Sequence, residues 1–173
     1  MVTWAEFEAA APDLAGHGRR LFYQFDIGLG FLATVRKDGG PRVHPMCPIL
    51  CDGDLYAFIV TMSFKRGDLL RDGRYAMHSF PTPPPEPPST TGDEEFYIDG
   101  RARRIDDPAL RRRVVECTGG RLGTHDFEEL WTFDIDRALH TAWHNWATPG
   151  TYPVYTKWSP AKGLRVEGGT HGA

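Results

Sequence analysis

Short runs of alternating apolar and polar residues dominate this chain, a pattern that is typical of β-strands. Residues 29–36 follow a two-residue period, and residues 55–60 are dense in aromatic and β-branched side chains. Turns rich in glycine and aspartate at 37–40 and 52–54 separate these runs from the segment 42–50. We therefore predict two hairpins in succession, which together form a meander.

Prolines make the middle segment of this meander an unusual strand. Pro45 and Pro48 have no backbone N–H group and cannot donate a hydrogen bond to a neighbouring strand. We expect this segment to be irregular, bulged or at a sheet edge. Further strand patterns, with a bend or bulge expected at Gly100, occupy residues 75–80, 95–105, 130–143 and 152–158.

Helix signals lie between the strands. Thr3 and Glu6 have the spacing of a capping box, and Pro12 interrupts the helix that they begin. Residues 63–70 and 107–118 each start with a capping residue, which predicts two further helices. About six strands with helices inserted between some of them favour a mainly β (α+β) fold, an antiparallel barrel with peripheral helices.

The length and composition fit a single domain. A chain of 173 residues, 40% of them hydrophobic, can bury one substantial core. The proline-rich segment 81–88 predicts an extended surface loop inside the sheet rather than a domain boundary. The net charge of -3 provides no overall attraction to nucleic acid or to an anionic membrane. No apolar run approaches the roughly 20 residues that cross a bilayer, and no signal peptide is evident, so we expect a soluble, cytoplasmic protein.

Two cysteines and two histidines lie close together in the sequence. On a strand, neither pair is placed to form a disulfide or to bind a metal ion together. On one strand, Cys47 and Cys51 would lie about 13 Å apart, at roughly 3.3 Å per residue. We therefore expect reduced, buried thiols. His140 and His144 have helical metal-ligand spacing but fall on a predicted strand, where the same separation of about 13 Å applies. No metal site is expected from this pair.

A basic turn carries the most informative chemistry. The segment 61–66, Thr-Met-Ser-Phe-Lys-Arg, places two hydroxyls and two cations at the start of a predicted helix. The free amides and the positive dipole end of a helix favour an anion there. Arg42 and His44 alternate along the neighbouring strand of the meander and should project toward the same side. Lys65 and Arg66 could instead be exposed helix cations, but together these groups indicate a phosphorylated cofactor.

Three segments resemble a known family: 39–45 (GGPRVHP), 55–66 (LYAFIVTMSFKR) and 68–77 (DLLRDGRYAM). They are similar to the flavin-binding split barrel of the pyridoxamine 5'-phosphate oxidase-like superfamily, and the order of elements matches over about residues 20–159. The resemblance implies a six-stranded antiparallel split barrel in one domain over residues 1–173. It also implies a homodimer, with flavin mononucleotide (FMN) bound across the subunit interface.

The resemblance assigns cofactor roles to individual residues. Ser63 and Lys65 match the serine and lysine that bind phosphate, with Arg66 as a weaker match beside them. Arg42 matches the arginine that reaches the flavin phosphate or the polar edge of the ring. The residues that would line the isoalloxazine are Val43 and His44 on one side and Ile59, Val60 and Thr61 on the other.

Departures from the family pattern narrow the expected activity. Cys47 stands where the true oxidase has a lysine, Phe64 stands where it has an arginine, and the closing W-x-x-x-R-L-x-P pattern is absent. Oxidation of pyridoxine 5'-phosphate is therefore not expected, and the chain looks more like the small actinobacterial-type members. We expect an FMN-dependent oxidoreductase acting on a small organic substrate. The alternatives are a reductase that uses a deazaflavin coenzyme, and a flavin- or haem-binding protein without turnover.

Overall fold

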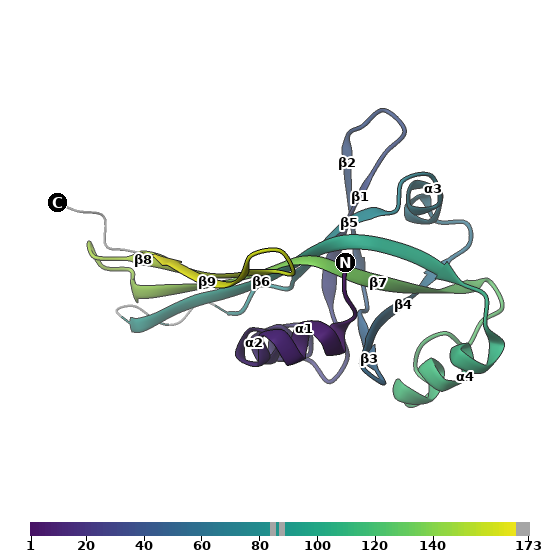
Figure 1. Cartoon of the computed structure of the whole chain (residues 1–173), viewed down its shortest axis with the longest axis horizontal. Coiled ribbons are helices and arrows are strands. Elements are labelled where there is room, and N and C mark those ends of the chain that lie inside the picture. Colours follow the sequence, from purple (N-terminus) through teal and green to yellow (C-terminus); the bar gives the residue numbers. More distant parts are fainter. Residues whose placement is uncertain (84–85, 87–88, 169–173) are drawn as a thin grey trace.

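Nine strands of the described residues form one antiparallel sheet (Figure 1). The computed structural model describes residues 1–83, 86 and 89–168, without the side chains of residues 90 and 91. Four positions of the predicted proline-rich loop, 84–85 and 87–88, lie outside the described residues. The strands are β1 (Gly30–Val35), β2 (Pro41–Met46), β3 (Ile49–Cys51), β4 (Asp54–Val60), β5 (Arg74–Ser79), β6 (Ser89–Ile105), β7 (Glu128–Trp146), β8 (Tyr152–Ser159) and β9 (Gly163–Gly168).

Two long strands hold this sheet together. The strand order is β2-β1-β5-β6-β7-β4-β3, with β8 paired to β7 and β9 paired to β8. Strand β7 is 19 residues long, so β4 pairs with its first part and β8 with its second part. Figure 1 shows β6 and β7 crossing the whole molecule, with β8 and β9 beside them at one end. The two ends of the sheet are therefore joined through β6 and β7.

The predicted meander is wrong. The β1–β2 hairpin and the β3–β4 hairpin lie at opposite ends of the strand order, and β4 pairs with β7 rather than with β2. The prolines explain the separation: β2 ends at Met46, and Pro48 cannot donate a hydrogen bond to extend the same ladder. The expectation of an edge strand is confirmed, because among the described strands β2 pairs with β1 alone. The sheet is a split barrel that is not closed.

Four helices occur in the described residues: α1 (Trp4–Ala10), α2 (Pro12–Phe22), α3 (Phe64–Arg71) and α4 (Pro108–Cys117). The predicted capping box is confirmed, since Thr3 Oγ1 accepts from the Glu6 backbone while the Glu6 carboxylate accepts from the Thr3 backbone. Helix α2 packs on β6 and β7, where Phe22 meets Phe96 edge to face in the core. None of the described helices has the length and apolarity needed to span a membrane.

Strand β6 bends at the predicted position. Its register with β7 shifts between Asp99 and Gly100. A Cβ atom at Gly100 would lie 1.9 Å from the backbone oxygen of Asp134, so only glycine fits this close approach. Strand β9 has no counterpart in the sequence prediction, because all six of its residues are exposed and show no alternation in burial.

A disulfide between Cys51 and Cys117 corrects the expectation of reduced thiols for these two residues. Their Cα atoms lie 5.9 Å apart, although 66 residues separate them along the chain. Packing of α4 against β3 brings them together, a proximity that residue spacing does not encode. By chain entropy, closing a loop of this length stabilises the fold by about 4 kcal/mol. Cys47 is free.

Replacing Gly100 with alanine should lower the free energy of unfolding by about 2–3 kcal/mol, because the new methyl group overlaps the Asp134 carbonyl. Gly67 is the matched control: it lies inside α3, where an added Cβ atom would meet nothing within 4 Å. Gly67→Ala should stabilise the fold by roughly 0.5–1 kcal/mol. Urea unfolding of the two variants and the wild type measures both effects, and equal midpoints for the two variants would contradict the close approach at Gly100.

Candidate functional site

A buried carboxylate lies at the centre of the candidate site. The side chain of Asp68, in α3, is 5% exposed. It accepts hydrogen bonds from Thr34 Oγ1 at 2.9 Å, Arg42 Nε at 2.8 Å and Arg71 Nη2 at 3.2 Å. Burial alone would raise the pKa of Asp68, but these three donors outweigh it and hold the pKa below its usual range. The group is therefore an anion at neutral pH, and it connects α3 to β1 and β2.

The contact with Asp68 fixes the orientation of Arg42. Its guanidinium lies over the ring of Phe64, with Cζ 4.8 Å from the ring centroid. Because Nε is bound to Asp68, the guanidinium plane is held by both neighbours. The Nη1 and Nη2 groups make no hydrogen bond within the part of the chain that the structure describes. Arg42 therefore retains donors for a ligand.

Lys65 approaches the same strand from the first turn of α3. Its Nζ donates to the backbone oxygen of Pro45 at 3.2 Å, which leaves further N–H groups of the ammonium available. Burial lowers the pKa of Lys65, and the nearby Cys47 acts in the opposite direction. Since the unperturbed pKa of a lysine is about 10.4, this shift leaves Lys65 a cation at neutral pH. The β2–α3 corner, which we define as Arg42, His44 and Lys65, thus contains two cations.

His44 contributes an unsatisfied polar atom to this corner. Its Nε2 is shielded from solvent and has no hydrogen-bond partner among the described residues. Burial lowers the pKa of His44, and the charges of Lys65 and Arg42 lower it further. The imidazole is therefore neutral at pH 7. A buried polar atom without a partner costs free energy, which a ligand atom at this position would recover.

Ser63 and Arg66 have intramolecular partners. Ser63 is the N-cap residue of α3, but its hydroxyl donates to the backbone oxygen of Val60 at 2.7 Å and makes no capping hydrogen bond. Arg66 forms a two-fold contact with Glu129, through Nε at 2.6 Å and Nη2 at 2.9 Å. The carboxylate of Glu129 on β7 thus balances the positive charge of Arg66, whereas the Lys65 ammonium contacts β2.

The remaining predicted residues lie around the end of β4 or on the outside of β2. Ile59 is fully buried, so its side chain belongs to the core and does not reach a surface ligand. Val60 and Thr61 are half-buried, and Thr61 N donates to the Phe127 backbone oxygen at 2.8 Å. Val43 alternates with Arg42 and His44 along β2 and is 61% exposed. The structure therefore groups Arg42, His44 and Lys65 and separates them from Ile59.

Exposed apolar side chains flank the β2–α3 corner. Met62 is 77% exposed and Phe64 is 72% exposed, and both come from the turn that begins α3. Val43 on β2 and Phe127 before β7 are also exposed. Large apolar side chains that cluster at a surface commonly mark an interface or a ligand site.

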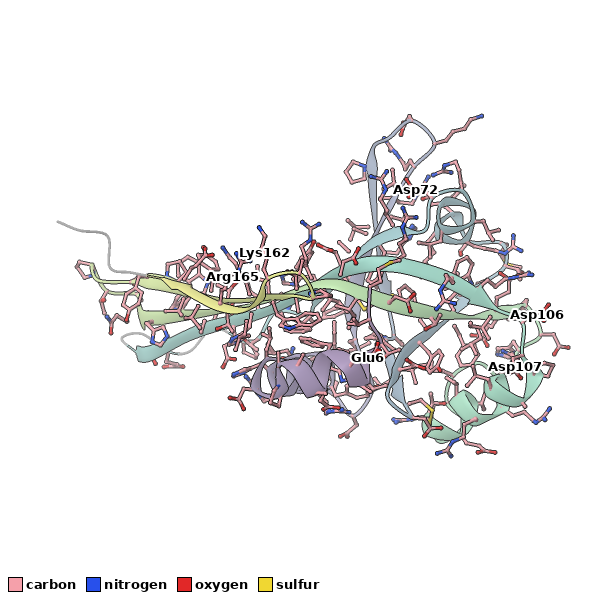
Figure 2. All side chains as sticks on the ribbon, viewed as in Figure 1. Glu6, Asp72, Asp106, Asp107, Lys162 and Arg165 are labelled. Atoms are coloured by element: carbon pink, nitrogen blue, oxygen red, sulfur yellow. A yellow bond between two sulfur atoms is a disulfide. The ribbon has the colours of Figure 1, made fainter. Side chains whose placement is uncertain are left out.

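A second polar surface lies on the long strands. Lys162 and Arg165 project above β8 and β9, whereas α1 and α2 lie below the sheet (Figure 2). Both line a cavity of about 480 Å³, and Trp158 forms part of its wall. Neither cation forms an ion pair with another described residue. This cavity is a second place that could receive an anionic group, distinct from the β2–α3 corner.

The sequence analysis missed Asp68. Only the spacing of Asp68 and Arg71, three residues apart on a helix, could have indicated an ion pair. Its burial and its contact with Thr34 depend on how α3 packs on β1.

Comparison with known protein families assigns the chain to one of them. The model of the family described as pyridoxamine 5'-phosphate oxidase matches residues 22–138, which is more than half of the 173 residues. The chain therefore belongs to this family, within the FMN-binding split-barrel superfamily. The match includes β2, α3 and Asp68. No curated protein matches the chain.

Solved structures share the fold. A putative 5-nitroimidazole antibiotic resistance protein from Bacteroides thetaiotaomicron has a TM-score of 0.59 at 16% identity, over 88% of this chain and 86% of that chain. A pyridoxamine 5'-phosphate oxidase-related, FMN-binding protein from Nostoc punctiforme has a TM-score of 0.56 at 14% identity, over 95% of this chain and 96% of that chain. The haem storage protein HutZ from Vibrio cholerae has a TM-score of 0.56 at 14% identity, over 71% of this chain and 90% of that chain. At these identities the similarity concerns the fold alone.

Replacing Asp68 with asparagine should lower the free energy of unfolding at pH 7 by about 2–3 kcal/mol, because Arg42 and Arg71 lose a charged acceptor. The pKa of Asp68 is lower in the folded chain than the unfolded value of about 3.9, so its stabilisation is complete above that value. This stabilisation is lost as the pH falls through the folded pKa. The difference between wild type and variant should therefore shrink in acid.

Urea unfolding at a series of pH values between 7 and acid tests this prediction. Asp106→Asn is the control, because Asp106 is exposed in the loop before α4 and its carboxylate makes no hydrogen bond or ion pair among the described residues, so this variant should change stability little. A difference between wild type and Asp68→Asn that stays constant with pH would show that the carboxylate charge is not what stabilises this corner.

Proposed function

We propose that this protein binds FMN, with the cofactor phosphate at the β2–α3 corner, and acts as an FMN-dependent oxidoreductase on a small organic substrate. The observation that carries the proposal is the convergence of three groups at the start of α3: the Lys65 ammonium, the unpaired amino groups of Arg42 and the unsatisfied Nε2 of His44. Family membership and the FMN-binding protein from Nostoc punctiforme support the same choice of cofactor.

The chemistry of this corner fits a phosphate. A dianion gains from the positive end of α3 and from charge-assisted hydrogen bonds, each contributing on the order of 1.5–3 kcal/mol. Lys65 and Arg42 would supply these bonds. Ser63 can join them if its hydroxyl rotates away from the Val60 oxygen. Arg66 is not required, because Glu129 already balances its charge.

Bound FMN supplies the redox chemistry, since its ring accepts and donates hydride or single electrons. The chain binds and orients the cofactor through its phosphate and controls access of water to it. The pKa of His44 is lowered by burial and by its cationic neighbours, so the neutral imidazole can form one hydrogen bond through Nε2 without adding charge. Val60 and Thr61 at the end of β4 would border the ring.

We also propose that the working form is a homodimer with the cofactor at the interface. The exposed side chains of Val43, Met62 and Phe64 surround the corner and leave a planar ring there uncovered on one side. A second copy related by two-fold symmetry would cover both sites at once and bury these apolar surfaces.

The alternatives to FMN are a deazaflavin coenzyme and haem. A deazaflavin coenzyme would use the same class of split barrel. The likeness to HutZ, whose name states haem storage, favours haem on grounds of fold alone. The absorption spectrum of the isolated protein distinguishes oxidised flavin, deazaflavin and haem.

Replacing Lys65 with alanine should weaken FMN binding about 10- to 100-fold, because one charge-assisted phosphate contact is lost. Quenching of flavin fluorescence during titration of the apoprotein measures the dissociation constant. Arg112→Ala is the control: it removes an exposed cation of α4, outside both the corner and the β8–β9 cavity, and should leave the constant unchanged. Equal affinity of the wild type and Lys65→Ala for FMN would contradict the assignment of Lys65 to the cofactor phosphate.

Replacing Val43 with aspartate should convert the dimer into a monomer, because the variant places a charge in the proposed apolar interface. Sedimentation velocity at micromolar concentration should give twice the chain mass of 19.4 kDa for the wild type and the single mass for the variant. Val166→Asp is the control, since Val166 is 66% exposed on β9. A wild-type monomer that binds FMN tightly would contradict an interfacial site.

A further inference from the structure

Three potential metal ligands from separate elements meet beneath the long strands. They are His17 of α2, Glu94 of β6 and His140 of β7, and their ligand atoms all lie within 4.8 Å of one another. His140 Nε2 is 2.9 Å from Glu94 Oε2, and His17 Nδ1 is 3.7 Å from the same oxygen. The two imidazole rings stack with their centroids 4.0 Å apart. This cluster is formed by residues outside the β2–α3 corner.

The fold positions each member of the cluster. Strand β6 shifts its register with β7 between Thr91 and Glu94, and this irregularity ends at the carboxylate residue. His140 pairs with Phe96 across the same two strands, and its side chain is 7% exposed. Helix α2 lies over this part of the sheet and supplies His17. Two ligands are therefore held by paired strands and the third by a packed helix.

Two of the three distances between ligand atoms, those that end at Glu94 Oε2, are close to those of a tetrahedral site. Metal–ligand bonds of about 2.1 Å place neighbouring ligands about 3.4 Å apart, and the observed distances of 2.9 and 3.7 Å lie on either side of this value. The stacked rings must tilt toward a shared ion. His17, whose side chain is 41% exposed, has room for this movement. Two nitrogens and one oxygen leave a fourth position open to water.

Arg20 contacts two of the three potential ligands. Its Nη2 contacts Glu94 Oε2 and lies 3.2 Å from His17 Nδ1. The Arg20 side chain is 53% exposed, so the guanidinium can move into solvent when a metal ion replaces it. Arg20 thus supplies the positive charge for Glu94 in the metal-free chain and competes with a bound cation.

We propose that His17, Glu94 and His140 form a binding site for one divalent transition-metal ion of the zinc class, which displaces Arg20 from Glu94. Two imidazoles and a carboxylate are a donor set that suits Zn²⁺. The sequence pattern could not show this site, because it paired His140 with His144, whereas the fold pairs it with residues from two other segments. The proposal is independent of flavin binding.

Calorimetric titration of the chain with ZnCl₂, after removal of any polyhistidine tag and treatment with a chelator, tests the proposal. We expect one equivalent of Zn²⁺ per chain. His17→Ala should weaken binding at least about 100-fold, since loss of a ligand exceeds the 10- to 100-fold effect of losing an outer partner. His125→Ala removes an exposed histidine outside the cluster and should change nothing. His17 is chosen because its exposure allows the variant to fold.

Arg20→Gln separates a metal site from a purely structural ion pair. The variant should bind Zn²⁺ severalfold more tightly, because the competing guanidinium is gone. Substitution with Co²⁺ gives a second readout, a visible absorption band that His17→Ala should abolish. The proposal is overturned if no Zn²⁺ binds, if His17→Ala binds as tightly as wild type, or if Arg20→Gln shows no gain in affinity.

Discussion

The buried carboxylate of Asp68 is the interaction on which the candidate site depends. It is the common acceptor for Thr34 of β1, Arg42 of β2 and Arg71 of α3, so one group sets the relative position of three elements. Removing a carboxylate from water is costly unless several donors compensate, and the three hydrogen bonds to Asp68 provide this compensation. With Arg42 held by its Nε, the rest of its guanidinium is oriented before a ligand arrives. Such preorganisation lowers the entropic cost of binding an anion.

The open sheet explains why a charged corner can exist beside an apolar surface. The β1–β2 hairpin projects from the body of the molecule beside α3, as Figure 1 shows. Among the described residues β2 pairs only with β1, so no strand covers its other edge, where the Pro45 oxygen accepts from Lys65, and Val43 is exposed. An exposed strand edge next to exposed Phe64 and Met62 is a surface that a second subunit would be suited to cover.

Local patterns predicted local structure well. The capping box at Thr3, the bulge at Gly100 and the helix that begins after Asp107 all follow from interactions within a few residues or from the steric needs of one residue, and all are present. The placement of Lys65 in the first turn of a helix also follows from the N-cap position of Ser63.

Long-range pairing was not predictable in the same way. The meander prediction was wrong because sequence order suggests that consecutive hairpins are neighbours, whereas β4 pairs with β7, far along the chain. The disulfide of Cys51 with Cys117 and the burial of Asp68 arise only from packing between distant segments. The roles of Arg42 and Arg66 diverge for the same reason. Both looked like anion-binding cations, but Arg66 meets Glu129 of β7, which residue spacing could not reveal.

The most direct measurement of the central claim compares the affinities of the apoprotein for FMN and for riboflavin at one ionic strength. The two ligands share the isoalloxazine ring and differ by the phosphate. If the β2–α3 corner holds that phosphate, FMN should bind at least about 100-fold more tightly, because two charge-assisted contacts are absent with riboflavin. Equal dissociation constants for the two ligands would contradict the account, since the corner would then contribute nothing to recognition of the cofactor.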